Sequence, residues 1–180
     1  SKPLSFKNVL FSSKPVTLGL PNTVIFQYDA TNSNADSVFI QQSWDLKKRY
    51  KVDKHLHEYT STYYYPGYYR AKLILNDSIV KEHDVYIETD GWVGIIEKKP
   101  IPIYSPKNLF ERQLSLTQEK LSELKIDFQK EAPIFSLTKV DKGITLMSDD
   151  FSLQVQLQNT YKQSNSICQY TEVLILGTNG

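Results

Sequence analysis

This 180-residue chain has almost no cysteine. Its single thiol, Cys168, excludes any internal disulfide. Cys168 lies in an apolar run, Ile167 to Leu176. Such a position is typical of a thiol packed in a core, and a reactive or intermolecular thiol is the alternative. No run is long and apolar enough to span a membrane, and no signal peptide is recognisable. The chain starts at Ser1 without a methionine and ends soon after the apolar run. We therefore expect a piece cut from a longer protein.

An excess of charge of one sign is also missing. The chain has 21 Lys and Arg against 20 Asp and Glu, so its formal net charge is +1. The electrostatic footprint of a nucleic-acid-binding protein is therefore absent, and we expect no nucleic-acid partner. The 7 glycines stand singly, which argues against a phosphate-binding loop.

Residues that could catalyse a reaction do not gather in a recognisable pattern. There is no nucleophile elbow, and the histidines lie far in the sequence from Cys168. Glu82 with Asp84, or Asp149 with Asp150, could form a pair of catalytic carboxylates, but neighbouring acids more often mark the loop before a strand. We therefore expect a protein that is not an enzyme.

The histidines supply one candidate metal set. His55, His57 and His83 with Glu58 are side chains that suit zinc, and residues two apart on an extended chain face the same side. The surrounding loop is basic and no further ligand cluster accompanies them. Surface histidines are the favoured interpretation, and we expect no metal and no cofactor.

Strand-forming residues dominate what is present. The chain has 12 Tyr and 8 Phe beside many Val, Ile and Thr, which predicts an all-β fold. Apolar residues alternate in 24–30 and again in 38–44, where Val38, Ile40 and Trp44 would share a face. We expect a weak edge strand between Leu4 and Leu20, because prolines interrupt that segment.

The chain around Trp44 and the Pro66-Gly67 turn is predicted to form the core of the first unit. Alternation resumes after the turn and places one set of residues inside. The predicted structural core residues are Trp44, Gly67, Tyr69 and Leu73. The pair Asn76-Asp77 then predicts a turn into a return strand.

A charged segment from Leu46 to Glu58 shows no strand or helix period, so we expect a solvated loop, with a shallow anion-contacting surface as the alternative. A cluster of tyrosines follows it. Tyrosine suits both a structural corner and an exposed aromatic binding patch, and both interpretations stay open. The candidate binding residues at this surface are Tyr59, Tyr64, Tyr68, Lys47, Lys48 and Arg49.

The run Glu97 to Pro102 predicts a linker, because its prolines force an extended chain. We expect a first unit over residues 1–98, a linker over 99–106 and a second β-rich unit over 107–180. In the second unit Thr117 can cap a short helix over Gln118 to Leu124, the one helix that we expect. Alternation over 151–158 and the apolar run 173–176 predict two further strands.

The first half resembles a PKD domain, an immunoglobulin-like β-sandwich. The resemblance lies in Trp44-Asp45 and in the segment with Tyr63 or Tyr64, Gly67, Tyr69, Ala71 and Leu73. It covers about residues 6–96, and the segment also looks similar to the PKD-like domains of large Bacteroidetes surface or periplasmic proteins. The chain departs from the family pattern at Leu46 to Arg49, where a Gly-Asp-Gly turn is usual.

The second half is similar to the opening strands of a concanavalin A-like lectin or laminin-G sandwich, through Asp150 to Asn159 and Cys168-Gln169-Tyr170. Only about half of the 150 to 250 residues that such jelly rolls need follows the linker, so we expect a partial unit.

Together the resemblances imply a non-catalytic binding, adhesion or spacer module of a larger envelope-associated protein, in the periplasm or at the cell surface. The expected partner is a glycan or another envelope protein, and the chain itself has no membrane span. The alternatives are a carbohydrate-binding protein that uses the lectin-like half, or an accessory domain of a glycan-processing enzyme.

Overall fold

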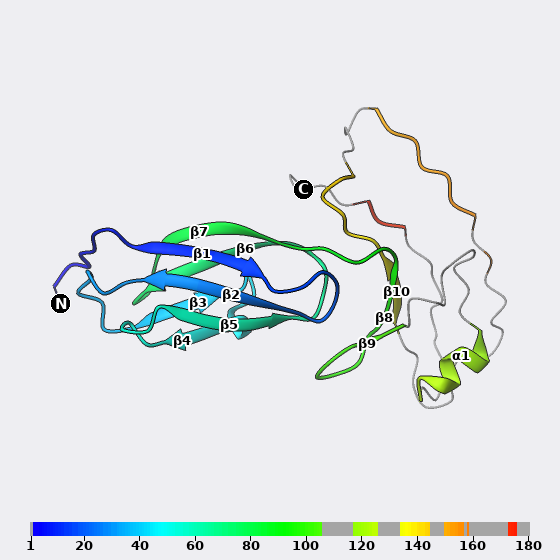
Figure 1. The fold of residues 1–180 in the computed structure, drawn as a ribbon, viewed down its shortest axis with the longest axis horizontal. Coiled ribbons are helices and arrows are strands. Elements are labelled where there is room, and N and C mark those ends of the chain that lie inside the picture. Colours follow the sequence, from blue (N-terminus) through cyan, green and yellow to red (C-terminus); the bar gives the residue numbers. More distant parts are fainter. Residues whose placement is uncertain are drawn as a thin grey trace. The chain divides into compact units, whose positions relative to one another are not determined.

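The computed structural model describes residues 2–105, 117–125, 134–144, 150–156, 158 and 173–175. The chain divides into two compact units, Ser1–Asp90 and Gly91–Gly180. The all-β prediction is confirmed, since the described strands form three antiparallel sheets beside one short helix (Figure 1).

Unit 1 contains a three-stranded and a four-stranded sheet (Figure 1). The three-stranded sheet has the order β1-β2-β5, and the four-stranded sheet has the order β4-β3-β6-β7. The strands of the first sheet are β1 (Leu10–Pro15), β2 (Asn22–Asp29) and β5 (Glu58–Tyr63). Those of the second are β3 (Val38–Gln41), β4 (Arg49–Val52), β6 (Gly67–Leu75) and β7 (Ser78–Ile87).

The core of unit 1 is built from the alternating inward residues of both sheets. In β2 the buried apolar residues are Val24, Phe26 and Tyr28, and in β6 Leu73 and its alternate neighbours are buried in the same cluster. The sheets therefore pack face to face over one hydrophobic core. Apolar burial of this kind supplies the main stabilising free energy of such a domain.

Several strand and turn predictions are confirmed. β1 is an edge strand of its sheet, within the segment that prolines interrupt. Asn76 and Asp77 join β6 to β7, and Asn76 adopts a positive φ of 53°. Its Oδ1 accepts hydrogen bonds from the backbone N–H groups of Asp36 (3.0 Å) and Ser37 (3.1 Å), which ties this turn to the loop before β3.

The prediction of an irregular loop over Leu46 to Glu58 is wrong in its first part. Leu46–Lys48 form a 3₁₀ helix, η1, and Arg49–Val52 form the edge strand β4. β4 pairs with β3 from Arg49 opposite Gln41 to Val52 opposite Val38. Its inward residues are Tyr50 and Val52, and a single inward aromatic in a run of cations gives too weak an alternation to recognise.

Unit 2 contains a three-stranded sheet of order β10-β8-β9, made of β8 (Val93–Ile96), β9 (Ile103–Tyr104) and β10 (Phe135–Thr138). The helix α1 spans Gln118–Glu123, close to the predicted helix. The division between units falls after Asp90 rather than at residue 98, because β8 pairs with strands that follow it in the chain. The predicted linker over 99–106 includes β9.

Most residues of the two predicted lectin-like strands, 151–158 and 173–176, belong to the described part of the chain. Residues 151–156 and 173–175 are exposed and form no strand in the part of the chain that the structure describes. The strand that alternation predicted over 151–156 is therefore not found, since a strand also needs a neighbouring strand with which to form hydrogen bonds. Cys168 lies outside the described residues, as do Leu157, Asn159 and Leu176.

Candidate functional site

Trp44 is exposed, which corrects its assignment to the core. Its relative exposure is 74%. β3 ends at Gln41, and the backbone N–H of Gln42 donates to Lys48 O (3.0 Å), so the chain turns before Trp44. The side chain of Gln42 occupies the buried position instead, donating to Ser61 Oγ (2.6 Å) and Thr62 O (3.0 Å).

The indole of Trp44 is stacked on the ring of Tyr69. The ring centroids are 6.1 Å apart and the planes differ by 8°. Tyr69, partly buried at the edge of the core, meets the ring of Tyr63 edge-on at 4.7 Å and donates from its hydroxyl to Tyr65 O (2.8 Å). We call the stacked pair Trp44 and Tyr69 the aromatic platform. It presents one flat ring to solvent on a support that is anchored in the core.

The support of the aromatic platform is well packed. Tyr63 is 1% exposed and donates to Gln42 O (3.2 Å). Burial and the neighbouring Tyr69 and Tyr50 raise the pKa of Tyr63 far above its ordinary value, so its hydroxyl stays protonated and keeps this bond. The ring of Tyr69, on which Trp44 is stacked, therefore rests on a buried and hydrogen-bonded neighbour.

The two candidate lysines, Lys47 and Lys48, follow Trp44 closely in the chain. Asp45 caps η1, its Oδ1 accepting from Lys47 N (2.9 Å), and Lys48 Nζ lies 5.8 Å from the centre of the Tyr64 ring. Neither lysine forms an ion pair with the described residues. The structure thus places Lys47 and Lys48 in η1 and Tyr64 directly after β5, at the Trp44 end of unit 1.

Arg49 has a structural position instead. Its guanidinium lies over Phe39 at 4.2 Å, donates to Asn76 O (3.0 Å) and pairs with Asp77 (3.7 Å). Arg49 Nε is buried without a hydrogen-bond partner among the described residues. Arg49 therefore covers the outer face of the four-stranded sheet.

Tyr59 and Tyr68 lie away from the aromatic platform. Tyr59 packs against the core and contacts Tyr50 at 5.9 Å, and burial raises its pKa. Tyr68 packs edge-on against Tyr86 at 5.9 Å, and a hydrogen bond to Asp84 raises its pKa. The six candidate residues therefore divide among several places rather than forming one surface.

The remaining predicted core residues are placed as follows. Leu73 is fully buried in the cluster between the sheets, as predicted. Gly67 is partly buried at the start of β6 with φ 139°, a value that favours glycine. Tyr69 lies at the edge of the core, where it supports Trp44.

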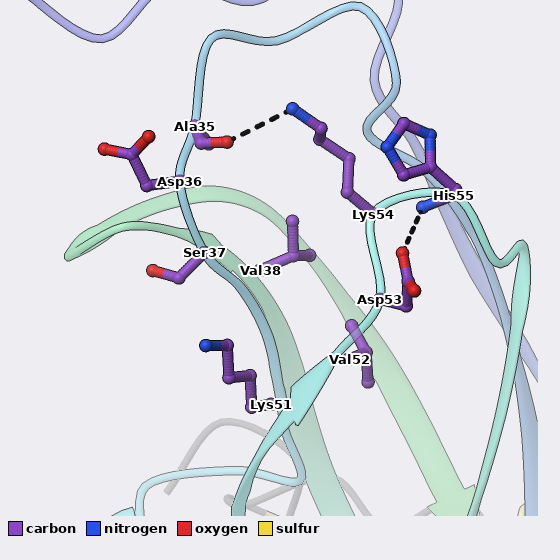
Figure 2. Close-up of a pocket in the computed structure, with 9 residues that line it drawn as sticks. All are labelled: Ala35, Asp36, Ser37, Val38, Lys51, Val52, Asp53, Lys54 and His55. Atoms are coloured by element: carbon purple, nitrogen blue, oxygen red, sulfur yellow. Dashed lines mark hydrogen bonds between the residues drawn. The ribbon is translucent and has the colours of Figure 1, made fainter.

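An open hollow lies at the other end of the β3–β4 pair (Figure 2). Two of its residues bond to the chain that forms it: Lys54 Nζ lies 3.3 Å from Ala35 O, and Asp53 Oδ1 accepts from His55 N (2.8 Å). These bonds order the two loops around it. The residues that line the hollow are Ala35, Asp36, Ser37, Val38, Lys51, Val52, Asp53, Lys54 and His55.

The histidines considered as metal ligands are separated. His57 Nδ1 lies 3.2 Å from Tyr28 O, whereas His83 Nε2 lies 2.6 Å from Ser13 Oγ. Within the described residues no three His, Cys, Asp or Glu side chains gather in a way that could hold a metal ion.

The carboxylates of Glu82 and Asp84 are engaged by cations on β6. Arg70 Nε lies 3.1 Å from Glu82 and Arg70 Nη1 lies 3.5 Å from Asp84, and Lys72 Nζ lies 3.8 Å from Glu82. Cross-strand ion pairs of this kind stabilise a sheet face modestly. These paired side chains form a charged outer surface of the sheet.

Comparison with known proteins assigns the chain to no family, because no family model, curated protein or solved structure matches it. No helix of the described residues is long and apolar enough to cross a membrane. The candidate binding site is therefore the aromatic platform together with Lys47 and Lys48. The sequence signal for it was Asp45, a capping residue directly after Trp44, which ends the strand period.

Proposed function

We propose that unit 1 is an immunoglobulin-like, PKD-like β-sandwich that serves as a non-catalytic binding or adhesion module, with the aromatic platform as its binding surface. Two antiparallel sheets that pack face to face over one core, with the fourth strand paired to the third, support this architecture. The resemblance at Trp44-Asp45 and at Gly67 to Leu73 supports a place in a larger envelope-associated protein, in the periplasm or at the cell surface.

The exposure of Trp44 carries this proposal. A tryptophan that is 74% exposed leaves a large apolar area in water, and burying that area against a partner is favourable. Tryptophan and tyrosine are also the residues that contribute most to binding free energy at interfaces. Because the indole is already stacked on Tyr69, which packs against the buried Tyr63, a ligand that covers Trp44 meets a partly ordered side chain, and this lowers the entropic cost of binding.

Carbohydrate binding through the lectin-like half is not the function that we propose. Within that half, the described residues of the segments predicted as lectin-like strands, 150–156, 158 and 173–175, are exposed and form no strand. They therefore offer no arranged set of ligand-binding side chains.

The proposal is tested with the full 180-residue chain immobilised for biolayer interferometry. The panel contains neutral glycans, acidic glycans and purified cell-envelope proteins. We expect at least one partner whose binding falls tenfold or more in Trp44→Ala. Trp92→Ala is the matched control, because Trp92 is the other tryptophan, is 46% exposed and lies in unit 2. If every partner binds wild type and Trp44→Ala equally, the platform is not the binding surface.

A further inference from the structure

We infer that the ligand of the aromatic platform is an acidic oligosaccharide, bound with one pyranose ring flat on Trp44 and its carboxylate beside Lys47 and Lys48. This inference rests on the proposed function, since it names the ligand class of the same surface.

The shape of the platform favours a sugar ring. Trp44 lies nearly parallel to the ring below it, so the two rings form a layered stack with one flat outer face rather than a groove between inclined rings. A π face is electron-rich and attracts partly positive groups. The C–H groups on one face of a pyranose are such groups, because the ring oxygen and hydroxyls withdraw electrons from them. A proline-rich peptide instead needs an aromatic-lined groove.

A nucleobase would also stack on a flat indole, but nucleic acid brings one charge for every nucleotide. Unit 1 would need many cations along a groove to bind it. The chain has a formal net charge of +1, and the arginines described in unit 1, Arg49 and Arg70, are paired with Asp77 and with Glu82 and Asp84. A sugar whose stacked ring carries one carboxylate needs only the two lysines beside the platform.

The charge beside the platform favours an acid over a neutral sugar. Lys47 and Lys48 end η1, which starts two residues after Trp44, and neither is paired with a carboxylate of the described residues. The nearest acid in the chain, Asp45, has one oxygen occupied by Lys47 N. The segment 44–48 therefore carries one negative and two positive charges. A carboxylate would form charge-assisted hydrogen bonds with either ammonium group, and the flexible lysine stems allow the reach.

The test is calorimetric titration of the full chain with oligomers of galacturonate, glucuronate and mannuronate. Each oligomer is paired with its methyl ester, which keeps the ring and removes the charge. We expect at least one acid to bind five-fold or more tightly than its ester at low salt, with the difference shrinking as salt rises. In the double variant Lys47→Gln, Lys48→Gln we expect the acid to bind no more tightly than the ester does.

Tryptophan variants locate the ring on the platform. Trp44→Ala should abolish binding of acid and ester alike, Trp44→Phe should keep part of it, and Trp92→Ala should bind as wild type does. Three results would overturn the inference: no acid binds, acid and ester bind equally, or Trp44→Ala retains binding. A Trp44-dependent partner that is a neutral glycan or a protein would overturn the acidic-sugar inference and leave the proposed binding surface intact.

Discussion

His83 on β7 and Ser13 on β1 are joined by a hydrogen bond between the two sheets, with 2.6 Å between His83 Nε2 and Ser13 Oγ. The imidazole also contacts Phe11 at 4.4 Å and lies 6.3 Å from Phe26. Its Nδ1 is buried with no hydrogen-bond partner among the described residues. The site thus holds a histidine in apolar surroundings, where a positive charge would be poorly solvated.

Unit 1 should lose stability in mild acid through His83. Burial lowers the pKa of His83 below its ordinary value of 6.5, and the neighbouring Asp84 opposes this only in part. Below about pH 6.5 the unfolded chain binds a proton that the folded chain does not, so the free energy of unfolding falls until the pH reaches the folded pKa. Urea unfolding between pH 5 and 8 measures this dependence. His83→Gln should flatten the profile, whereas His55→Gln, an exposed control, should leave it unchanged; equal profiles in all three proteins would refute the assignment.

The hydroxyl of Tyr63 should stabilise the fold. In Tyr63→Phe the backbone O of Gln42 loses its donor in a buried place, so we expect a loss of about 1 to 3 kcal/mol in unfolding free energy. Tyr50→Phe is the control, because its hydroxyl forms no hydrogen bond within the described residues. Urea unfolding of the full chain, with hydrogen exchange in β5 and β6, gives both values. A loss as small as that of the control would show that this bond contributes little.

Asn76 should matter both for its backbone angle and for its side chain. Its φ of 53° favours Asn or Gly, and its Oδ1 accepts from two backbone N–H groups. Asn76→Gly keeps the angle and loses the bonds, whereas Asn76→Ala loses both. We expect Asn76→Ala to destabilise by about 1 to 3 kcal/mol and Asn76→Gly by less. If the two variants lose equal stability in urea unfolding, the angle has no measurable cost.

Much of unit 1 could be predicted because local pattern and tertiary packing agree there. In β2 and β6 the period-two alternation coincides with full burial of one face, and Asn76-Asp77 satisfies the turn geometry with local chemistry. β4 could not be recognised because its strand character comes from pairing with β3, which a run of Arg49, Tyr50 and Lys51 does not reveal.

The binding surface was predicted only in its composition. The sequence grouped Lys47, Lys48 and Tyr64 with Tyr59, Tyr68 and Arg49, because they are close in the chain or alike in chemistry. The structure separates the last three, since alternation and pairing send neighbouring strand residues to different faces. Trp44 continued the alternation of β3 in the sequence, yet the turn closed by Gln42 N and Lys48 O stops the strand first.

The position of Trp44 predicts how its removal affects stability. A buried core tryptophan would cost about 3 to 5 kcal/mol on truncation to alanine. At 74% exposure, Trp44→Ala loses mainly the stack on Tyr69, so we expect a loss of about 0.5 to 1.5 kcal/mol in unfolding free energy. Leu73→Ala, at a fully buried position, is the contrasting variant and should lose about 2 to 5 kcal/mol.

Fluorescence checks the same point with Trp44 left in place. In the Trp92→Phe variant Trp44 is the only tryptophan, since the chain has 2, and its emission can be excited selectively over that of the tyrosines. Acrylamide should quench this emission readily, and its maximum should be typical of a hydrated indole. A blue-shifted, poorly quenched emission together with a core-sized loss of stability in Trp44→Ala would return Trp44 to the core. Ready quenching with a small loss leaves the indole at the surface, because only a side chain that contributes little to the fold can be that accessible to solvent.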